Sequence, residues 1–511
     1  MQSMQTLPYR KLINALLVYC LPTVMIGCAN DSGIRANVTA IEPTSSDLSQ
    51  LHLDGNGNWP DSNWIAQFHD PQLERLVSEA LAQNPDMQIA QARVLAAQAK
   101  AEEYGSARGF SGQANAQISR ARLPVAIEPF NANVAGNNLP VDVSINPWAT
   151  PTGLLAGVNY EFDLWGKKEA LQQALKSEQM ATALDSEQAR LTLTTTLVKL
   201  YFQYDYYVAM SDLLKEQIRT YGSIEELADA RVNQGLDGDY DRSDTQLKRS
   251  ALLTQQLTNE QNVTLTQLQL GLLAGAGPDR GFKLQRPALA ATSDAVLPAQ
   301  LPANLLGRRP DIIAARLRIE ALQAKAESTR ASFYPDINLS ALTGLMTTDV
   351  ASLLSSDAIF ASFGPAISLP IFDRGRIRAR LKADYANADM AISQYNKTVN
   401  QAFGDIVQQL TSISSTDSII EQQTRAVAAA ARIVEIAKTR HERGIGPNKA
   451  IMLAKLSMAA ETQKLLTLRA QRRTLQVELV RALGGGFSAG QYANVSKPSS
   501  SAQSNVARPT P

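Results

Sequence analysis

The sequence has few of the residues on which catalytic and metal sites depend. Among its 511 residues there are two cysteines, Cys20 and Cys28, and three histidines, His52, His69 and His441. The histidines are too far apart to match a metal-ligand motif, and no nucleophile, base and acid occur in a recognisable catalytic pattern. We therefore expect no catalytic site, no metal and no soluble cofactor, and we predict that the protein is not an enzyme.

Charge and apolar runs are also limited. Lys and Arg number 49 against 48 Asp and Glu, and aromatic residues make up 6% of the chain. No basic tract with interleaved aromatics is present, so we expect no nucleic-acid partner. Beyond residue 28 there is no run of about 18 apolar residues, which a transmembrane helix requires. If the chain crosses a membrane, it must do so by strands.

The amino terminus has the layout of an export signal. Arg10 and Lys11 precede the apolar run 12–26, and Gly27 precedes Cys28 in a lipobox-like sequence, MIGC. We predict a signal peptide over residues 1–27 and a covalent lipid, diacylglycerol with N-palmitate, on Cys28. A small buried helix with an incidental cysteine is the alternative. With Cys20 removed and Cys28 acylated, no thiol remains for a disulfide.

The chain repeats itself. Residues 85–102 read PDMQIAQARVLAAQAKAE and residues 310–327 read PDIIAARLRIEALQAKAE, with ten of eighteen positions identical. Each copy starts with Pro-Asp, which is typical of a helix amino terminus. Such internal similarity predicts a duplicated unit, a first repeat over 71–280 and a second over 306–486.

Alternating apolar and polar residues follow each copy. This period of two predicts two strands per repeat, within about 110–165 and about 335–372. The polar positions of the first pair include Gln117, Asn159, Glu161 and Asp163, which suit a wet surface.

Long helical tracts follow the strands. Residues 167–221 contain neither Gly nor Pro, and their apolar residues step by three and four, which indicates a coiled-coil seam. A tract with the same spacing follows the second strand pair. Each tract reaches a glycine-marked tip, at Gly235 and Gly444, and a return helix comes after it.

The remaining segments are polar or rich in breakers. We expect an extended, lipid-anchored segment over 28–70, a linker between the repeats over 281–305 and a disordered tail over 487–511.

Four strands cannot form a closed membrane barrel alone, because membrane strands tolerate no open edge and such barrels begin at eight strands. Two copies of the chain would supply eight strands and three would supply twelve. The charged helices are expected outside the bilayer as a second, helical tube. A soluble coiled-coil scaffold is the competing interpretation.

Four stretches carry a resemblance to a known family: GRRPDIIAARLRIEALQAKAESTRASFYPDINLSALTG, YEFDLWGK, SLPIFDRGRIRA and LGGGF. Over roughly residues 55–490 the sequence resembles the TolC-like outer-membrane factors, and more narrowly the NodT-type efflux lipoproteins, including MdtP-like multidrug-resistance proteins. The resemblance implies a mixed α/β homotrimer in the outer membrane of a Gram-negative bacterium. Its twelve-stranded β-barrel would continue into a coiled-coil helical barrel in the periplasm.

The resemblance also implies partners and site residues. The helical tips would contact a periplasmic adaptor that connects an inner-membrane transporter to the channel. The matching tip residues are Arg231, Gly235 and Leu236 in the first repeat and Arg440, Gly444 and Ile445 in the second.

For the gate, the usual acidic positions are Ala450 and Leu453 here, so the acidic ring is missing. Asp241 matches a family position that makes closing contacts. We therefore predict a gate formed by Asp241 and a hydrophobic constriction near Leu453, against the simpler interpretation of a solvated acidic turn.

The expected function is passive efflux of drugs or other small toxic compounds. The alternatives are a duct for a secreted protein and, more distantly, a structural periplasmic lipoprotein. The sequence does not identify the substrate, the adaptor or the class of pump.

Overall fold

A computed structural model describes residues 33–41, 59–122, 130–134, 137–141, 148–289 and 307–487. The proposed signal peptide, Cys28, most of the linker between the repeats and residues 488–511 lie outside these ranges. The chain forms two compact units. One consists mainly of Ala97–Gln179 and Ile319–Met390, and the other of Thr39–Ala96, Met180–Arg318 and the residues from Ala391 onward.

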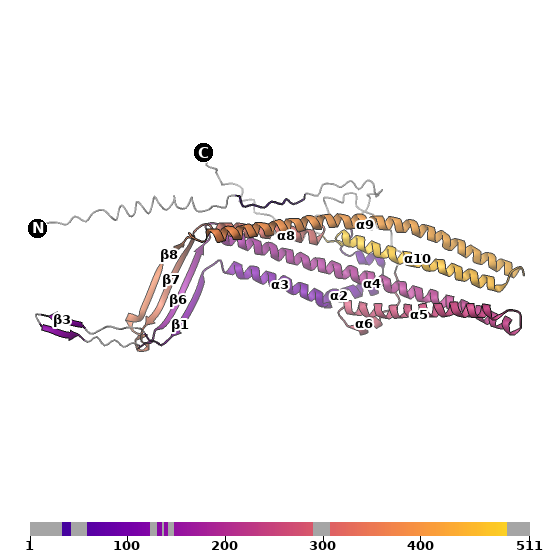
Figure 1. The fold of residues 1–511 in the computed structure, drawn as a ribbon, viewed down its shortest axis with the longest axis horizontal. Coiled ribbons are helices and arrows are strands. Elements are labelled where there is room, and N and C mark those ends of the chain that lie inside the picture. The colour runs from indigo at the N-terminus through magenta and orange to yellow at the C-terminus, as the bar shows by residue number, and fades with distance from the viewer. Residues whose placement is uncertain are drawn as a thin grey trace, which may run out of the picture. The chain divides into compact units, whose positions relative to one another are not determined.

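The first unit contains an antiparallel sheet of four strands (Figure 1). The strands occur in the order β1-β6-β7-β8. They are β1 (Ser111–Ile118), β6 (Thr152–Phe162), β7 (Asp336–Thr347) and β8 (Ile359–Ser368). The two predicted strand pairs are therefore present, and β6 of the first pair joins β7 of the second.

Short elements occupy the links between these strands. Two two-stranded ladders, β2 with β5 and β3 with β4, lie between β1 and β6 in sequence. Two 3-10 helices separate β7 from β8. Their bounds are β2 (Ala121–Arg122), β3 (Phe130–Val134), β4 (Asn137–Val141), β5 (Trp148–Ala149), η3 (Val350–Ser352) and η4 (Ser356–Ala358).

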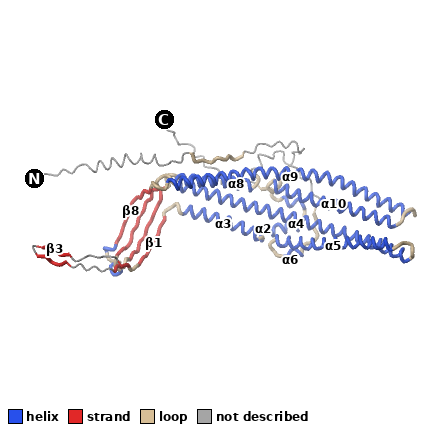
Figure 2. Tube along the Cα trace, in the orientation of Figure 1, coloured by secondary structure: helices blue, strands red, loops and turns tan. Residues whose placement is uncertain are grey.

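The helices are long, as their sequence spacing predicts (Figure 2). The helix predicted over 167–221 continues through Gly222 and ends at Asn233. The principal helices are α3 (Pro85–Ser106), α4 (Lys167–Asn233), α5 (Asp239–Leu273), α8 (Pro310–Ala331), α9 (Arg374–Glu442) and α10 (Asn448–Ala482). Corresponding helices of the two halves match closely in length: α3 and α8 have 22 residues each, and α5 and α10 have 35 each.

The described residues of the second unit also form three shorter helices: η2 (Trp64–Phe68), α2 (Pro71–Gln83) and α6 (Pro278–Phe282). α2 begins at Pro71, and Asp70 caps it by accepting hydrogen bonds from the backbone N–H groups of Gln72 and Leu73. η2 interrupts the stretch that was expected to be extended.

An aromatic core holds α2 to α4 within the second unit. Phe68, Leu73, Tyr201 and Phe202 are buried there, and the rings of Phe68 and Phe202 meet edge to face at 4.9 Å. The Tyr201 hydroxyl donates a hydrogen bond of 2.8 Å to Asp70 Oδ2. Burial raises the pKa of Tyr201, so its phenol stays protonated and serves packing rather than proton transfer.

The residue before each Pro-Asp start bonds to the end of a return helix. Asn84 Nδ2 donates to the carbonyl oxygen of Leu273, the last residue of α5. Arg309 Nη1 donates to the carbonyl oxygen of Ala482, the last residue of α10. These bonds satisfy carbonyls that have no partner within their helices. The two halves thus use different side chains for the same structural purpose.

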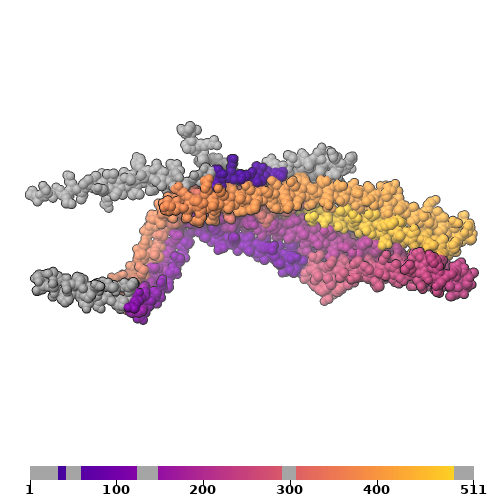
Figure 3. Space-filling view, in the orientation of Figure 1, coloured from indigo at the N-terminus to yellow at the C-terminus, as the bar shows by residue number. Residues whose placement is uncertain are grey.

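An amino-terminal strap, residues 33–41, lies along α9 (Figure 3). In the first unit, the backbone N–H groups of Asn37 and Val38 donate to Asp389 Oδ1 at 2.9 and 3.0 Å. In the second unit, Ile41 N–H donates to Asn396 Oδ1 at 2.8 Å. Increasing residue numbers in the strap therefore follow increasing residue numbers in α9.

None of the described helices carries a stretch that is long and apolar enough to cross a bilayer.

Candidate functional site: the hairpin tips and the two-faced sheet

The two helical hairpins end in turns of the same geometry. In the first, Gly235 has φ 71° and Leu236 N–H donates to the Arg231 carbonyl; in the second, Gly444 has φ 73° and Ile445 N–H donates to the Arg440 carbonyl, both at 2.9 Å. A left-handed residue followed by this long-range bond is a common helix ending, and glycine adopts it without a Cβ penalty.

The residue after each tip glycine is apolar and exposed to solvent. Leu236 is 61% exposed and Ile445 is 65% exposed. Both chain reversals thus present one apolar side chain beside charged residues, which is a composition suited to contact with another protein. The structure places the six predicted tip residues on two turns of one unit.

An ion pair fixes the first turn internally. Arg231 Nε and Nη2 donate to the two carboxylate oxygens of Asp237 at 2.6 and 3.1 Å. This two-point contact closes the turn around Gly235, since Arg231 lies on α4 and Asp237 follows the reversal. The hydrogen bonds from Arg231 lower the pKa of Asp237 below its ordinary value of 3.8.

The lowered pKa of Asp237 predicts that the stability of the first turn depends on pH. A carboxyl group with a lowered folded-state pKa contributes stability that is complete above about pH 4 and is lost as the pH falls through the folded-state value, below 3.8. We expect pepsin to cleave the first tip faster at about pH 2 than at about pH 3.5, after correction for its activity on an unfolded peptide. Asp237→Asn should be cleaved rapidly at both values. Equal cleavage of the native chain and Asp237→Asn at the higher pH would contradict the assignment.

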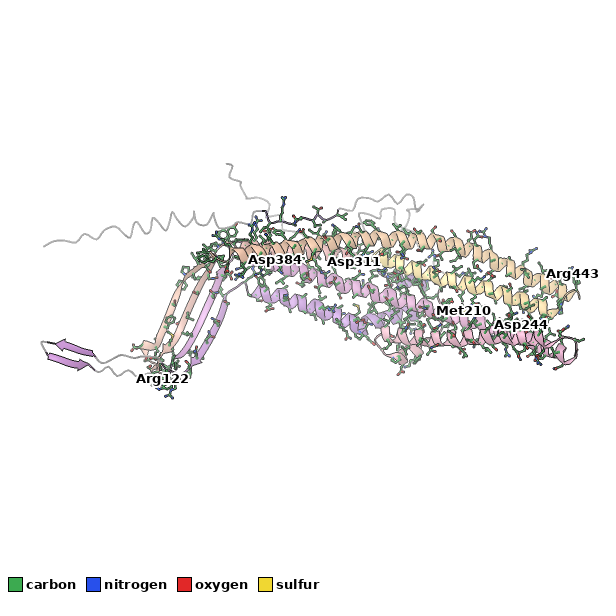
Figure 4. All side chains as sticks on the ribbon, in the orientation of Figure 1. Arg122, Met210, Asp244, Asp311, Asp384 and Arg443 are labelled. Atoms are coloured by element: carbon green, nitrogen blue, oxygen red, sulfur yellow. The ribbon has the colours of Figure 1, made fainter. Side chains whose placement is uncertain are left out.

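A second ion pair joins the two hairpins. Lys449 Nζ, in the first turn of α10, donates to Asp241 Oδ2, in the first turn of α5, at 2.6 Å. The two side chains are 35% and 42% exposed, respectively. Figure 4 labels Asp244 and Arg443, which mark the same ends of the two hairpins. This contact brings together residues 208 positions apart in the sequence.

Sequence reasoning selected Asp241 and missed its partner. Lys449 immediately precedes Ala450, one of the two positions where an acid was sought. A search for a cation able to pair with Asp241 could have selected Lys449, but the tip contains several other cations. Leu453 lies on α10 and is 48% exposed, and it has no polar function of its own.

The sheet has one apolar and one polar face. Pairing places Val158 opposite Ala341, and Ala341 opposite Phe363, so these side chains share a face. The same registers place Asn159 opposite both Ser111 and Ser340 on the other face. The predicted alternation therefore aligns across all four strands, which is what a sheet between lipid and water requires.

In the single chain, the apolar face of the sheet is exposed. Its large exposed residues come from three of the four strands, β1, β6 and β8: Ile118, Leu154, Val158, Phe162, Ile359, Phe363 and Ile367. Such a contiguous apolar surface marks an interaction with lipid or protein rather than with water. Among the described residues, no group of three or more His, Cys, Asp or Glu is arranged to hold a metal.

A two-faced antiparallel sheet continuing into long helical hairpins defines the class of outer-membrane channel proteins. The model of the outer membrane efflux protein family matches residues 76–276 and 301–485 of the chain. The chain therefore belongs to this family. The predicted outer-membrane location and the efflux class are therefore confirmed.

Individual relatives agree. The chain is 28% identical to the multidrug resistance outer membrane protein MdtP of Escherichia coli K12, over 92% of this chain and 95% of that protein. It is 34% identical to the fusaric acid resistance protein FusA of Burkholderia cepacia, over 73% of this chain and 69% of that protein. The crystal structure of the outer membrane protein VceC of Vibrio cholerae matches with a TM-score of 0.73 and 30% identity, over 84% of this chain and all of VceC.

Proposed function

We propose that three copies of this chain form a passive duct that exports drugs or other small toxic compounds across the outer membrane. The observation that carries this proposal is the two-faced sheet, whose strands lead directly into long helical hairpins. The apolar face suits lipid and the polar face suits a water-filled passage. The duct needs no catalytic group, because an inner-membrane transporter would supply the energy.

The open edges of the sheet call for further copies of the chain. Within the described residues, β1 and β8 each pair with only one of the other strands of the four-stranded sheet. Open edges are not tolerated in a bilayer, so they must be closed by other copies. Three copies give twelve strands and a wider passage than the minimum of eight. The similarity to the outer membrane efflux family supports the trimer.

The two tips are proposed as the adaptor-binding surface. Leu236 and Ile445 supply exposed apolar contacts, and Arg231 and Arg440 lie one helical turn before them. A periplasmic adaptor with apolar pockets at the ends of its own hairpin would fit these two reversals. It would connect the duct to the inner-membrane transporter.

The gate is proposed at the contact between the hairpins. The Asp241–Lys449 ion pair holds α5 to α10, so opening that separates these helices must break it. Leu453 lies one turn along α10 from Lys449 and would form an apolar constriction when three copies meet. The acidic ring is missing at Ala450 and Leu453. The polar contact at this level of the hairpins is instead the ion pair of Lys449 with Asp241 in the same chain.

The lipid anchor on Cys28 is supported by the direction of the strap. Ile34 packs near Phe333, Ile377 and Leu381, and the strap then follows α9 away from the sheet. Cys28 precedes Ile34 by six residues, and six extended residues reach about 20 Å. A lipid on Cys28 would therefore be anchored within about that distance of the residues that follow β8.

We also infer that the two halves arose by duplication. The matching helix lengths, the two equivalent tips and the shared bonding of Asn84 and Arg309 support this. Each half would supply one wedge of the wall, and three chains would supply six.

The function is tested by deleting the gene and measuring two quantities. We expect intracellular accumulation of fluorescent drugs to rise, and the secreted proteome to stay unchanged. Loss of a secreted protein with normal drug accumulation would favour the protein-secretion alternative. Purified protein that forms no conducting trimer in liposomes would favour the structural coiled-coil alternative.

Partner contact is tested by crosslinking in cells. Cysteine placed at Gly235 or at Gly444 carries a photoactivatable maleimide, and captured proteins are identified by mass spectrometry. Cysteine at Gly404, a helical position that is not at a tip, serves as the control. Capture of a periplasmic adaptor only from the tips is expected, and equal capture from Gly404 would contradict the tip assignment.

A further inference from the structure

The helical end of the sheet carries aromatic residues of the kind found at membrane surfaces. At this end, β6 and β8 lead into α4 and α9. Trp165 stacks on Tyr334 with ring centroids 4.8 Å apart, and its Nε1 donates to the Pro335 carbonyl oxygen at 2.9 Å. Tryptophan and tyrosine concentrate where headgroups meet hydrocarbon, because each has an apolar ring and a polar edge. In the proposed channel, this cluster therefore marks the level of the lipid headgroups.

The segment that follows β8 is first apolar and then strongly basic. Ile371 and Phe372 are 59% and 97% exposed. Residues 373–380 read DRGRIRAR and contain four arginines and one acid. Because α9 begins at Arg374, these arginines lie near a helix end that already carries partial positive charge. They are placed against the preference of the helix, which favours a role in binding an anion.

A pocket of about 650 Å³ lies beside this segment. Its volume falls within the roughly 300–1,000 Å³ of pockets that hold small molecules. Its charged lining consists of three cations, Lys167, Arg376 and Arg380, and two carboxylates, Asp336 and Asp373. One positive charge is therefore left over, which suits a ligand with a single negative charge.

Two of the three cations have a carboxylate partner. Lys167 Nζ donates to both carboxylate oxygens of Asp336, at 2.9 and 3.1 Å. Arg376 Nη2 donates to Asp373 Oδ2 at 3.2 Å, and the Arg376 side chain is 73% exposed. A guanidinium has more N–H donors than this contact uses. Arg376 can thus donate to a second anion while it remains paired.

Arg380 is the cation that is left for a ligand. Its side chain is exposed, and no carboxylate among the described residues pairs with it. Asp384, labelled in Figure 4, lies four residues further along α9, which is a spacing that allows a helical ion pair. Asp384 is instead buried and accepts a hydrogen bond from Thr329 Oγ1 at 2.6 Å. The N–H donors of Arg380 are therefore unshared at the pocket.

We propose that this pocket binds the phosphate of phosphatidylglycerol, a phospholipid whose headgroup carries one net negative charge. Arg376 and Arg380 would donate to the phosphate oxygens, because a guanidinium matches phosphate with two parallel N–H groups. An acyl chain would lie against Phe372 and Ile371. Basic clusters next to a membrane-spanning element bind anionic headgroups in this way. The inference rests on the proposed channel, which places the sheet in the bilayer, and it names a lipid ligand for the periplasmic leaflet.

Lipid preference is tested by native mass spectrometry of the purified full chain. The detergent contains equal amounts of phosphatidylglycerol, phosphatidylethanolamine and phosphatidylcholine. We expect phosphatidylglycerol to be retained preferentially, with one molecule per chain. Equal retention of the three lipids would overturn the inference. Complete displacement of phosphatidylglycerol by millimolar inorganic phosphate would show a site for phosphate alone and would overturn the lipid assignment.

Substitution of the arginines tests the role of charge. Arg380→Gln should weaken retention of phosphatidylglycerol about fivefold, and Arg376→Gln with Arg380→Gln about thirtyfold, since each basic residue near an anionic membrane surface contributes a factor of about five. Retention of phosphatidylcholine should not change. Arg219→Gln is the matched control, because it removes an exposed arginine of α4 that pairs with Glu216. Unchanged retention of phosphatidylglycerol by Arg380→Gln would contradict the proposal.

Phe372 tests whether lipid or protein covers this surface. Phe372→Ala should reduce retention of all three lipids alike, because the ring would contact the acyl chain and not the headgroup. A photoreactive benzophenone amino acid in place of Phe372 should crosslink to phospholipid in outer membranes. A crosslink mainly to a second copy of the chain would assign this surface to a contact between chains and would overturn the lipid site.

Conduction is measured on the same preparation. A trimer that conducts in liposomes but shows no preference for phosphatidylglycerol would overturn this inference alone. A preparation that forms no conducting trimer would instead overturn the proposed function.

Discussion

Asp241→Ala should raise the open probability of the channel more than any other single substitution at the tips. The substitution removes the 2.6 Å contact to Lys449, which joins α5 to α10. A partly exposed ion pair is worth about 0.2–1 kcal/mol. In the proposed trimer, three chains that open together would lose it three times, so the ratio of open to closed channels should rise between about threefold and 150-fold.

The measurement is single-channel conductance in planar bilayers, together with vancomycin sensitivity of cells. Lys449→Ala should give the same increase, and the double substitution should add little, because one contact accounts for both effects. Asp244→Ala is the matched control, since Asp244 pairs with Lys248 on its own helix at 2.8 Å. It should leave conductance unchanged.

Charge reversal makes the test specific. The combination Asp241→Lys with Lys449→Asp restores an ion pair between the hairpins and should return the open probability toward that of the native channel. If Asp241→Ala and Leu453→Ser both leave conductance and vancomycin exclusion unchanged, the gate lies elsewhere and Asp241 belongs to a solvated turn.

Gly484→Ala should prevent assembly of the protein. Gly484 has φ +89°, and a Cβ added there would lie 2.0 Å from the carbonyl oxygen of Arg308. Neither atom can move away easily, because both belong to backbone at the junction of α10 and α8. Overpacking of this kind commonly costs about 1–3 kcal/mol or more, and the left-handed conformation adds about 1 kcal/mol.

The measurement is the yield of folded trimer in the outer membrane, with urea unfolding of any protein recovered. Gly444→Ala separates the two contributions, because Gly444 has φ +73° but nothing within 4 Å of an added Cβ. It should cost about 1 kcal/mol only. Gly275→Ala, where the Cβ would lie 2.5 Å from the Gln83 carbonyl oxygen, should behave like Gly484→Ala. Equal yields for Gly484→Ala and Gly444→Ala would show that the junction relaxes around the added methyl.

Much of the fold could be predicted from local patterns. The alternation in Ala156–Phe162 predicts a strand, and the absence of Gly and Pro in 167–221 predicts a long helix, because both depend on neighbours in the sequence. The tip glycines could be found for the same reason, since a left-handed reversal requires a residue without Cβ penalty.

The contacts between distant segments could not be predicted in this way. Nothing local to Asp241 indicates that Lys449 is its partner, because several cations lie near the tips and only the packing of α5 beside α10 selects one. Asn84 and Arg309 each bond to the last carbonyl of a return helix. Their side chains differ chemically, so the sequence does not indicate that they are equivalent.

By itself, then, the sequence determined the strands, the helices and the two faces, because periodicity records which side of each element meets water. The efflux class was implied by the resemblance of its motifs to a known family. The tertiary structure alone decided that β6 joins β7, that Lys449 meets Asp241 and that β1 and β8 are left as edges. The physical reason is that strand pairing and long-range ion pairs depend on which surfaces are brought together, and many sequence positions could satisfy each contact equally well.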